Sequence, residues 1–171
     1  MAITTTEILF ERAHPQSVVA AMRRMQSSGE GEGWINLHPL LSDDQATRLP
    51  EQTTIGSWFS GRGPAVSNAT WTPAQRTKRE TPAQVGISHG TGPGALDRLE
   101  ELGLALPAGW TKRQDHAKHG IVADVPETAD QADVLRWMLD ACTALPTVVR
   151  AGDDWVAAVH GFDLGPAPSN R

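Results

Sequence analysis

The pattern of apolar and polar positions is clearest between residues 84 and 160. Residues 84–89 alternate apolar with small or polar side chains, which predicts a short strand. After a glycine-rich turn, leucines recur at helical spacing and predict a helix over residues 95–102. These leucines are Leu96, Leu99 and Leu102. Gly103 suits the left-handed conformation that commonly ends a helix.

A hairpin and a second helix are predicted next. Residues 110–114 and 121–125 are typical of two strands, and residues 115–120 form the tip between them. Thr128, with Gln131 three positions later, fits a capping box at the start of a helix. The apolar stripe of this helix consists of Val134, Leu135, Met138, Leu139, Cys142 and Leu145.

A final strand is predicted over residues 155–160. In order, residues 84–160 give β-α-β-β-α-β, the order of the split βαβ or ferredoxin-like unit, so the expected fold class is α+β. In that unit both helices lie on one face of an antiparallel sheet. Residues 155–159 and 121–123 are apolar on both faces. We therefore expect the second face to be covered by the N-terminal half or by a second copy of the chain.

The first half of the chain has a less regular pattern. Residues 4–12 are predicted as a short helix, and Pro15 as the start of another. The buried side of the second helix is expected to carry Val18, Val19, Met22 and Met25. Residues 34–38 and 65–71 are typical of strands that extend the sheet or cover its free face.

One α+β domain is expected over residues 1–164. It divides into an N-terminal α/β half at residues 1–80, which covers the sheet, and a ferredoxin-like half at 84–160. Residues 165–171 are rich in Gly, Pro and Ser and are predicted to form a tail.

Composition excludes several classes of protein. Lys and Arg number 15 against 20 Asp and Glu, and a net charge of −5 argues against nucleic-acid binding held by charge. The single cysteine, Cys142, cannot form an internal disulfide framework. No apolar run approaches the roughly 18 residues of a membrane span, and residues 1–7 show no basic and apolar leader. We therefore expect a soluble protein of the cytoplasm.

Histidines and a carboxylate gather on the predicted hairpin tip. Asp115, His116 and His119 lie there, while His89 and His160 each end a predicted strand. Nitrogen and oxygen ligands of this kind suit zinc or another divalent ion. The spacing matches no zinc motif, so a polar turn with Asp115 bonded to backbone amides is the alternative interpretation. No cofactor is predicted, with zinc or another divalent ion as the alternative.

The glycine-rich loop between the first strand and helix of this half is the candidate anion site. Backbone N–H groups before a helix attract anions, and residues 61–125 carry eight basic and six acidic side chains, a net +2. The candidate residues are Arg62, Gly90, Thr91, Gly92, Lys112 and Arg113. The loop matches neither of the common phosphate-binding patterns, so a tight strand-to-helix connection is the alternative.

Two further candidates have ordinary structural explanations. Cys142 falls on the buried stripe of its helix, where a thiol is inert. Trp71 precedes the basic run at residues 76–79, a combination that can bind single-stranded nucleic acid. The predicted strands at 85–89 and 121–125 contain no aromatic residue, however, so nucleic-acid binding is not expected.

Several short segments carry a resemblance. They are Gly-Trp at 109–110, Gln-Asp-His at 114–116, Gly-Ile-Val at 120–122 and Leu-Arg-Trp-Met-Leu at 135–139. Together they resemble uncharacterised proteins from actinobacteria over residues 55–160. No activity is attached to that group, so the resemblance implies no catalytic residues. It agrees with the excess of Arg over Lys, 12 to 3, which favours a GC-rich bacterial source.

The expected function is a non-catalytic protein-binding or self-assembly module. Six tryptophans in a small acidic domain, and strands that are apolar on both faces, favour an interaction surface. The alternative is a small metal- or anion-binding enzyme or ligand-binding protein. Its pocket would lie around His89, Asp115, His116 and His119, and would require these side chains to converge.

Overall fold

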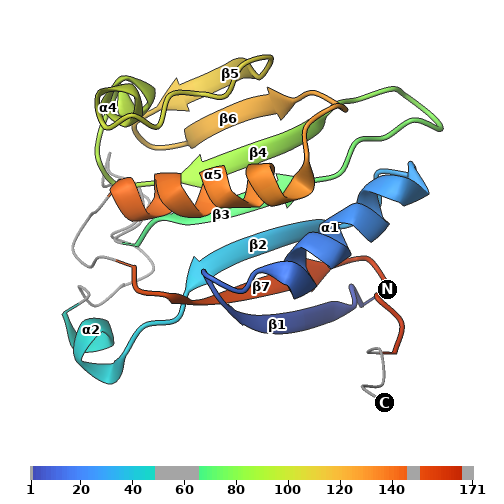
Figure 1. Ribbon diagram of the computed structural model, residues 1–171, viewed down its shortest axis with the longest axis horizontal. Coiled ribbons are helices and arrows are strands. Elements are labelled where there is room, and N and C mark those ends of the chain that lie inside the picture. Colours follow the sequence, from blue (N-terminus) through green and yellow to red (C-terminus); the bar gives the residue numbers. More distant parts are fainter. Residues whose placement is uncertain (1, 49–65, 146–150, 167–171) are drawn as a thin grey trace.

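The computed structural model describes residues 2–48, 66–145 and 151–166 (Figure 1). Its strands are β1 (Thr5–Glu11), β2 (Trp34–Pro39), β3 (Asn68–Thr72), β4 (Ala83–Ser88), β5 (Thr111–His116), β6 (Gly120–Val125) and β7 (Asp154–His160). Its helices are α1 (Gln16–Ser28), α2 (Asp43–Thr47), α4 (Ala95–Glu101) and α5 (Gln131–Ala144). None of the helices in these ranges is long and apolar enough to cross a bilayer.

All seven strands form one antiparallel sheet, in the order β1-β7-β2-β3-β4-β6-β5. Helices α1 and α5 lie side by side across one face of this sheet, and α4 packs beside β5 (Figure 1). The expected α+β class is therefore confirmed.

The arrangement of strands differs from the expected unit. Residues 83–160 do run β4-α4-β5-β6-α5-β7, as predicted. In space, however, β2 and β3 stand between β4 and β7, so the ferredoxin-like unit is not confirmed. The expectation that the N-terminal half covers the second face of the sheet is wrong, because β1, β2 and β3 join the same sheet and α1 lies on the face that α5 already occupies.

The first strand corrects another expectation. Residues 4–12, predicted as a helix, contain β1, which pairs with β7. Ile8 and Phe10 alternate toward the apolar core while Glu7 and Leu9 are turned to solvent. A run of β-branched threonines before this alternation favours an extended chain over a helix.

The helices follow their apolar stripes. In α1 the buried residues include Val18, Val19, Met22 and Met25, as expected. In α5 the predicted stripe, including Cys142, is likewise buried. The cap of α5 is Asp130 rather than Thr128, since the Asp130 carboxylate accepts a hydrogen bond from the Ala132 N–H at 2.9 Å.

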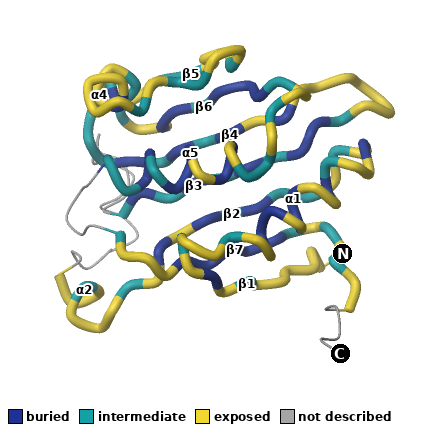
Figure 2. Tube along the Cα trace, in the orientation of Figure 1, coloured by how far each residue is buried: buried dark blue, intermediate teal, exposed yellow. Residues whose placement is uncertain are grey.

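The core lies between the helices and one face of the sheet. Alternate residues of the central strands point into it and are fully buried, as the dark central strands of Figure 2 show. The largest of these strand residues are Trp71, Trp155, Ile35, Leu37, Ile87 and Ile121. Burial of these side chains under α1 and α5 is what fixes the position of the sheet.

The opposite face is not a second apolar layer. No helix of the described ranges packs on it, and polar or small residues such as Asn36, Thr70 and Gly86 follow one another across neighbouring strands. Val156 and Ala158 do lie on this face and are only 5% and 6% exposed. They are short side chains flanked in register by longer ones from β1 and β2, so they are shielded without a covering layer.

Candidate functional site

The glycine-rich loop between β4 and α4 receives a carboxylate from its own chain. Asp115 on β5 accepts hydrogen bonds from the backbone N–H groups of Ala95 at 3.3 Å and Leu96 at 3.1 Å. These are the first amides of α4. Asp115 thus takes the place that an external anion would need beside Gly90, Thr91 and Gly92. The geometry favours the tight strand-to-helix connection over an anion site.

The basic residues assigned to the anion site do not surround this loop. Arg113 forms an ion pair with Asp124 on β6, and Gln84 donates a hydrogen bond to the same carboxylate at 2.8 Å. Burial acts to raise the pKa of Asp124, but the hydrogen bonds from Arg113 and Gln84 outweigh it and hold this pKa below its usual value. Lys112 is exposed on β5, and Arg62 lies outside the described residues.

His89 is a core histidine. Its side chain is fully buried, and its Nδ1 lies 2.9 Å from the Thr91 hydroxyl. Within the described part of the chain its Nε2 has no hydrogen-bond partner. Burial lowers the pKa of His89, Asp115 opposes this shift, and Arg98 adds to it. The ring is therefore held neutral at the end of β4.

The expected metal ligands do not converge. Asp115 and His116 are consecutive strand residues, so their side chains point to opposite faces of the sheet. His116 and His119 stack at 4.7 Å, and His116 Nδ1 accepts hydrogen bonds from the backbone N–H groups of Lys118 and His119 at 3.0 and 3.2 Å. Among the described residues no three His, Cys, Asp or Glu side chains are grouped as metal ligands would be.

Two other chemical candidates are buried. Burial raises the pKa of the Cys142 thiol to about 12, so it carries no reactive thiolate at neutral pH. Trp71 is 1% exposed and cannot stack on a base. Arg76, which follows it, pairs with Glu127 at 2.7 Å. The basic and aromatic residues of this segment therefore form no accessible stacking platform.

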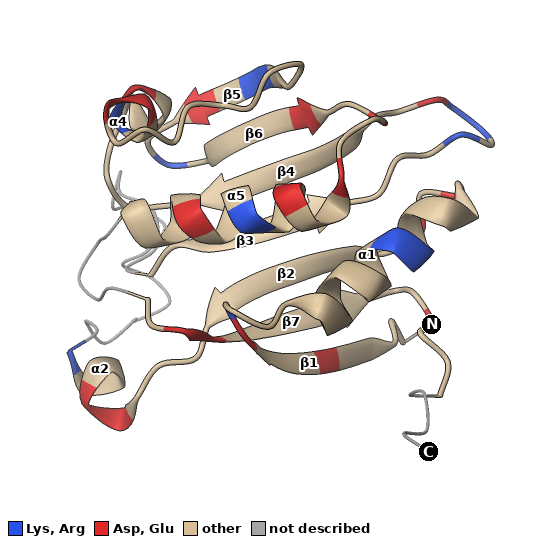
Figure 3. Cartoon of the chain, viewed as in Figure 1, with Lys and Arg blue, Asp and Glu red and all other residues tan. Residues whose placement is uncertain are grey.

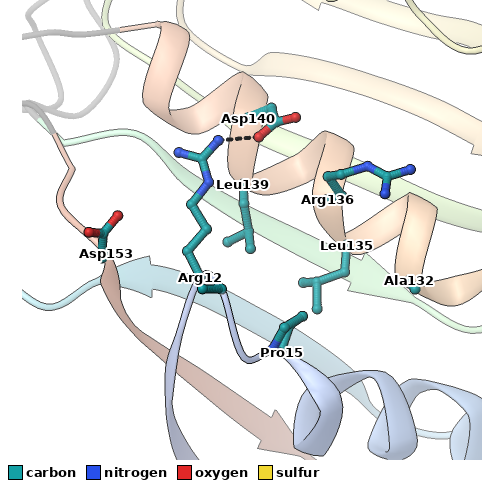
Figure 4. Close-up of a pocket in the computed structure, with 9 residues that line it drawn as sticks. Arg12, Pro15, Ala132, Leu135, Arg136, Leu139, Asp140 and Asp153 are labelled. Carbon is teal, nitrogen blue, oxygen red and sulfur yellow. Dashed lines mark hydrogen bonds and ion pairs between the residues drawn. The ribbon is translucent and has the colours of Figure 1, made fainter.

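A groove of about 520 Å³ opens between the β1–α1 connection and α5. Figure 4 shows Leu135 and Leu139 at its floor and Arg12 reaching across it to Asp140. Arg12 also donates a hydrogen bond to the Thr143 hydroxyl at 3.1 Å, and Arg136 pairs within α5. The lining includes no histidine, cysteine or serine. Arg12 thus fastens the end of β1 to α5, and the groove lining offers no hydroxyl, thiol or imidazole group.

A polar network fastens β1 to the sheet on the opposite face. Thr5 Oγ1 lies 2.9 Å from His160 Nδ1, and Asn36 Nδ2 lies 3.2 Å from His160 Nε2. Thr70 donates a hydrogen bond to Asn36 Oδ1 at 2.9 Å, and Trp34 stacks on His160 at 5.0 Å. A neutral ring protonated on Nδ1 satisfies both contacts. The network therefore ties four strands together and engages both ring nitrogens of His160.

The outer side of β1 is one of the two edges of the sheet in the described part of the fold. β1 is the last strand of the sheet, and five of its seven residues are exposed. Leu9 is 70% exposed, an unusual position for a large apolar side chain on a strand. Figure 2 shows this edge in yellow along most of its length.

Backbone groups at this edge alternate between β7 and open space. The Thr4 carbonyl accepts a hydrogen bond from the Gly161 N–H at 2.8 Å, and the Arg12 N–H donates to the Asp153 carbonyl at 2.7 Å. Even-numbered positions of β1 therefore bond to β7. The N–H and C=O groups of the odd-numbered positions point away from the sheet. These positions are Thr5, Glu7, Leu9 and Glu11.

Sequence reasoning missed both the network and the edge. Thr5, Asn36 and His160 are more than 30 residues apart from one another, and only the register of the strands brings them together. The edge was hidden by the helix expected over residues 4–12. The alternation of Ile8 and Phe10 with exposed residues was the available signal for a strand there.

Comparisons with known proteins identify no relative of this chain. No family model matches the chain, and neither the curated proteins nor the solved structures include a significant match. The resemblance to uncharacterised actinobacterial proteins therefore stays a prediction.

Proposed function

We propose that this chain is a non-catalytic protein-binding module that self-associates through the β1 edge of its sheet. The observation that carries the proposal is the row of outward backbone N–H and C=O groups on an exposed strand that ends the sheet. An unpaired strand edge is a template for pairing with another chain, because main-chain hydrogen bonds supply affinity without any special side chain.

The side chains of β1 support this role. Leu9 presents an apolar surface to solvent, and its burial against a partner would be favourable. The strand pairs with β7 over all seven residues without a shift of register, so its free side is regular. A regular edge with an exposed apolar residue is the kind that natural proteins usually protect.

The alternative of a small metal- or anion-binding protein has less support. Asp115 is already bonded to the amides of α4, and His116 is turned away from it. The groove beside α5 contains paired charges over a leucine floor. None of these places combines a nucleophile, a base and a group that stabilises negative charge, as catalysis would require.

The proposal is tested by measuring mass in solution against protein concentration. Sedimentation equilibrium of the native chain should give a mass that rises above the 18.4 kDa of one copy. Leu9→Glu should weaken association at least about tenfold, because it removes the exposed apolar side chain and adds a third carboxylate to an edge that already carries Glu7 and Glu11. Leu102→Glu is the matched control, since Leu102 is 61% exposed beside α4, near the other end of the sheet.

Two results would overturn the proposal. The first is a native chain that stays at the mass of one copy up to about 1 mM, a concentration at which even a weak interface is populated. The second is association that Leu9→Glu and Leu102→Glu weaken equally, because the β1 edge would then have no special part in it.

A further inference from the structure

We infer that the partner at the β1 edge is a second copy of this chain, paired antiparallel about a two-fold axis that passes through Ile8, and that assembly stops at two copies. The inference rests on the proposed function and adds the register, symmetry and stoichiometry of the contact. It follows from three features of the described residues: the direction of the free backbone groups, the position of the glutamates and the state of the other edge.

Backbone geometry restricts the register. The free N–H and C=O groups of β1 belong to odd-numbered residues. Antiparallel pairing exchanges hydrogen bonds between residues that both point their groups toward the partner, so odd positions must lie opposite odd positions. For two identical strands this condition allows symmetric pairing about Glu7, Ile8 or Leu9 while most of the strand stays paired.

The acidic residues select among these centres. Pairing about Glu7 places Glu7 opposite its own copy, and pairing about Leu9 places Glu7 opposite Glu11. Like charges directly opposite each other are destabilising. Pairing about Ile8 places Glu7 opposite Leu9 and Glu11 opposite Thr5. Only this last centre places no glutamate of the strand directly opposite another glutamate.

The same register continues the apolar layer of the fold. Ile8 and Phe10 face the side of the sheet that α1 covers, and both contact the core. Pairing about Ile8 sets the Ile8 side chains of the two copies against each other and places Phe10 opposite Thr6. The apolar layer of one copy would then continue into the other.

The far edge of the sheet explains why assembly would end at two copies. β5 has a shift of register between Lys112 and Gln114, and Lys112 and Arg113 are exposed on it. Bulges and basic residues are devices that prevent strand addition. Figure 3 shows both basic and acidic residues on β5, and an acidic residue on β1. A symmetric pair uses both β1 edges and leaves only protected β5 edges.

A disulfide tests the register directly. In Ile8→Cys the two thiols would face each other at a position that is not hydrogen-bonded, where Cβ atoms lie about 4.5–5.5 Å apart and a disulfide can form. Thr6→Cys is the matched control on the same side of the strand, because the two Thr6 positions would lie roughly 14 Å apart. Native Cys142 is buried and does not compete.

The expected result, on mild oxidation with copper phenanthroline, is a covalent dimer for Ile8→Cys and none for Thr6→Cys. Glu7→Cys and Leu9→Cys report the other centres, so preferential cross-linking of either overturns the Ile8 register. A native mass above that of two copies overturns closure at a dimer. If Leu9→Glu abolishes association but Ile8→Cys does not cross-link, this inference fails and the proposed function stands. If the native chain stays at the mass of one copy, both this inference and the proposed function are overturned.

Amide hydrogen exchange on the native chain gives a second measurement that needs no variant. Concentrated protein should protect the outward amides of Thr5, Glu7, Leu9 and Glu11, whereas dilute protein should leave them unprotected. If sedimentation shows that the sample is associated and these amides still exchange without protection, strand pairing at β1 is overturned.

Discussion

The two edge strands of the sheet, β1 and β5, differ in the regularity of their backbone and in the charges that they carry. At β5 the strand is interrupted by a shift of register, and Lys112 and Arg113 stand on it. At β1 the register with β7 is unbroken, the charges are acidic, and Leu9 is exposed. One chain therefore contains a protected edge and an unprotected edge. Most residues of both edge strands are exposed, so the contrast lies in the regularity of the backbone and the sign of the charges.

The helices behind the two edges differ as well. α1 connects β1 to β2 across thirteen residues and buries five of them, whereas α4 connects β4 to β5 with seven residues and buries two. The β1 side therefore has a well-packed helical layer behind its open edge. The β5 side depends more on polar contacts, such as those of Asp115 with α4 and of Asp124 with Arg113. In the proposed assembly, this helical layer would back the strand that pairs with a second copy.

The largest effect is expected from proline within β1. Ile8→Pro removes an N–H that bonds to β7 and leaves a carbonyl on β7 without its donor, which should cost at least about 2 kcal/mol of unfolding free energy. Leu9→Pro removes an outward N–H that one copy does not use, so its monomer should keep most of its stability while association is lost. Urea unfolding and sedimentation measure the two effects separately.

Matched losses of stability in the two proline variants would contradict the assignment of inward and outward positions. If the Leu9→Pro variant still associates, the β1 edge takes no part in the contact.

Lowering the pH is expected to reduce the unfolding free energy by an intermediate amount, through groups on the β5 side of the sheet. The pKa of buried His89 is lowered, so the folded state resists a proton that the unfolded state accepts below its ordinary pKa of 6.5. The stability that this provides is present above pH 6.5 and is lost as pH falls toward the folded pKa, by about 1.4 kcal/mol for each unit of lowering. Asp124 adds a second loss below its ordinary pKa of 3.8.

Urea unfolding at a series of pH values checks this sign. His89→Gln should remove the loss that begins near pH 6.5 and leave the loss below pH 3.8 in place. If the variant and the native chain lose stability in parallel over the whole range, another group is responsible for the first loss.

The smallest effect is expected at the protected edge. Lys112→Val replaces an exposed charge on β5, so unfolding free energy should change by no more than about 0.5 kcal/mol. The shift of register beside it remains, and the assembly should still end at two copies. Light scattering that detects larger species in this variant would show that the charge, more than the irregular backbone, protects β5.

Local patterns predicted the elements well where each element has its own apolar face. The stripe of α5 and the buried residues of α1 were both evident from spacing alone. Even there a detail was missed, because Asp130 and Thr128 are equally plausible caps by residue type and only the backbone path selects Asp130. The seven residues of β1 were mistaken for a helix, since threonines followed by a glutamate also resemble a helix start.

The candidate sites show where local patterns stop being informative. Asp115, His116 and His119 are neighbours in sequence and looked like ligands of one ion. The alternation of strand side chains separates Asp115 from His116, and the pairing of β5 with β6 brings Asp115 to the amides of α4. His160, considered earlier only as the end of a strand, is instead joined to Thr5 on another strand.

By itself the sequence determined which segments are strands and helices over most of the chain, which faces of them are apolar, and that Cys142 is an inert core residue. Only the tertiary structure decided that β2 and β3 lie between β4 and β7, that Asp115 caps α4, and that β1 ends the sheet, with the backbone groups of its odd-numbered residues unpaired among the described residues. The physical reason is that side-chain spacing acts within a segment, whereas strand order and edges depend on competition among distant segments for the same hydrogen bonds.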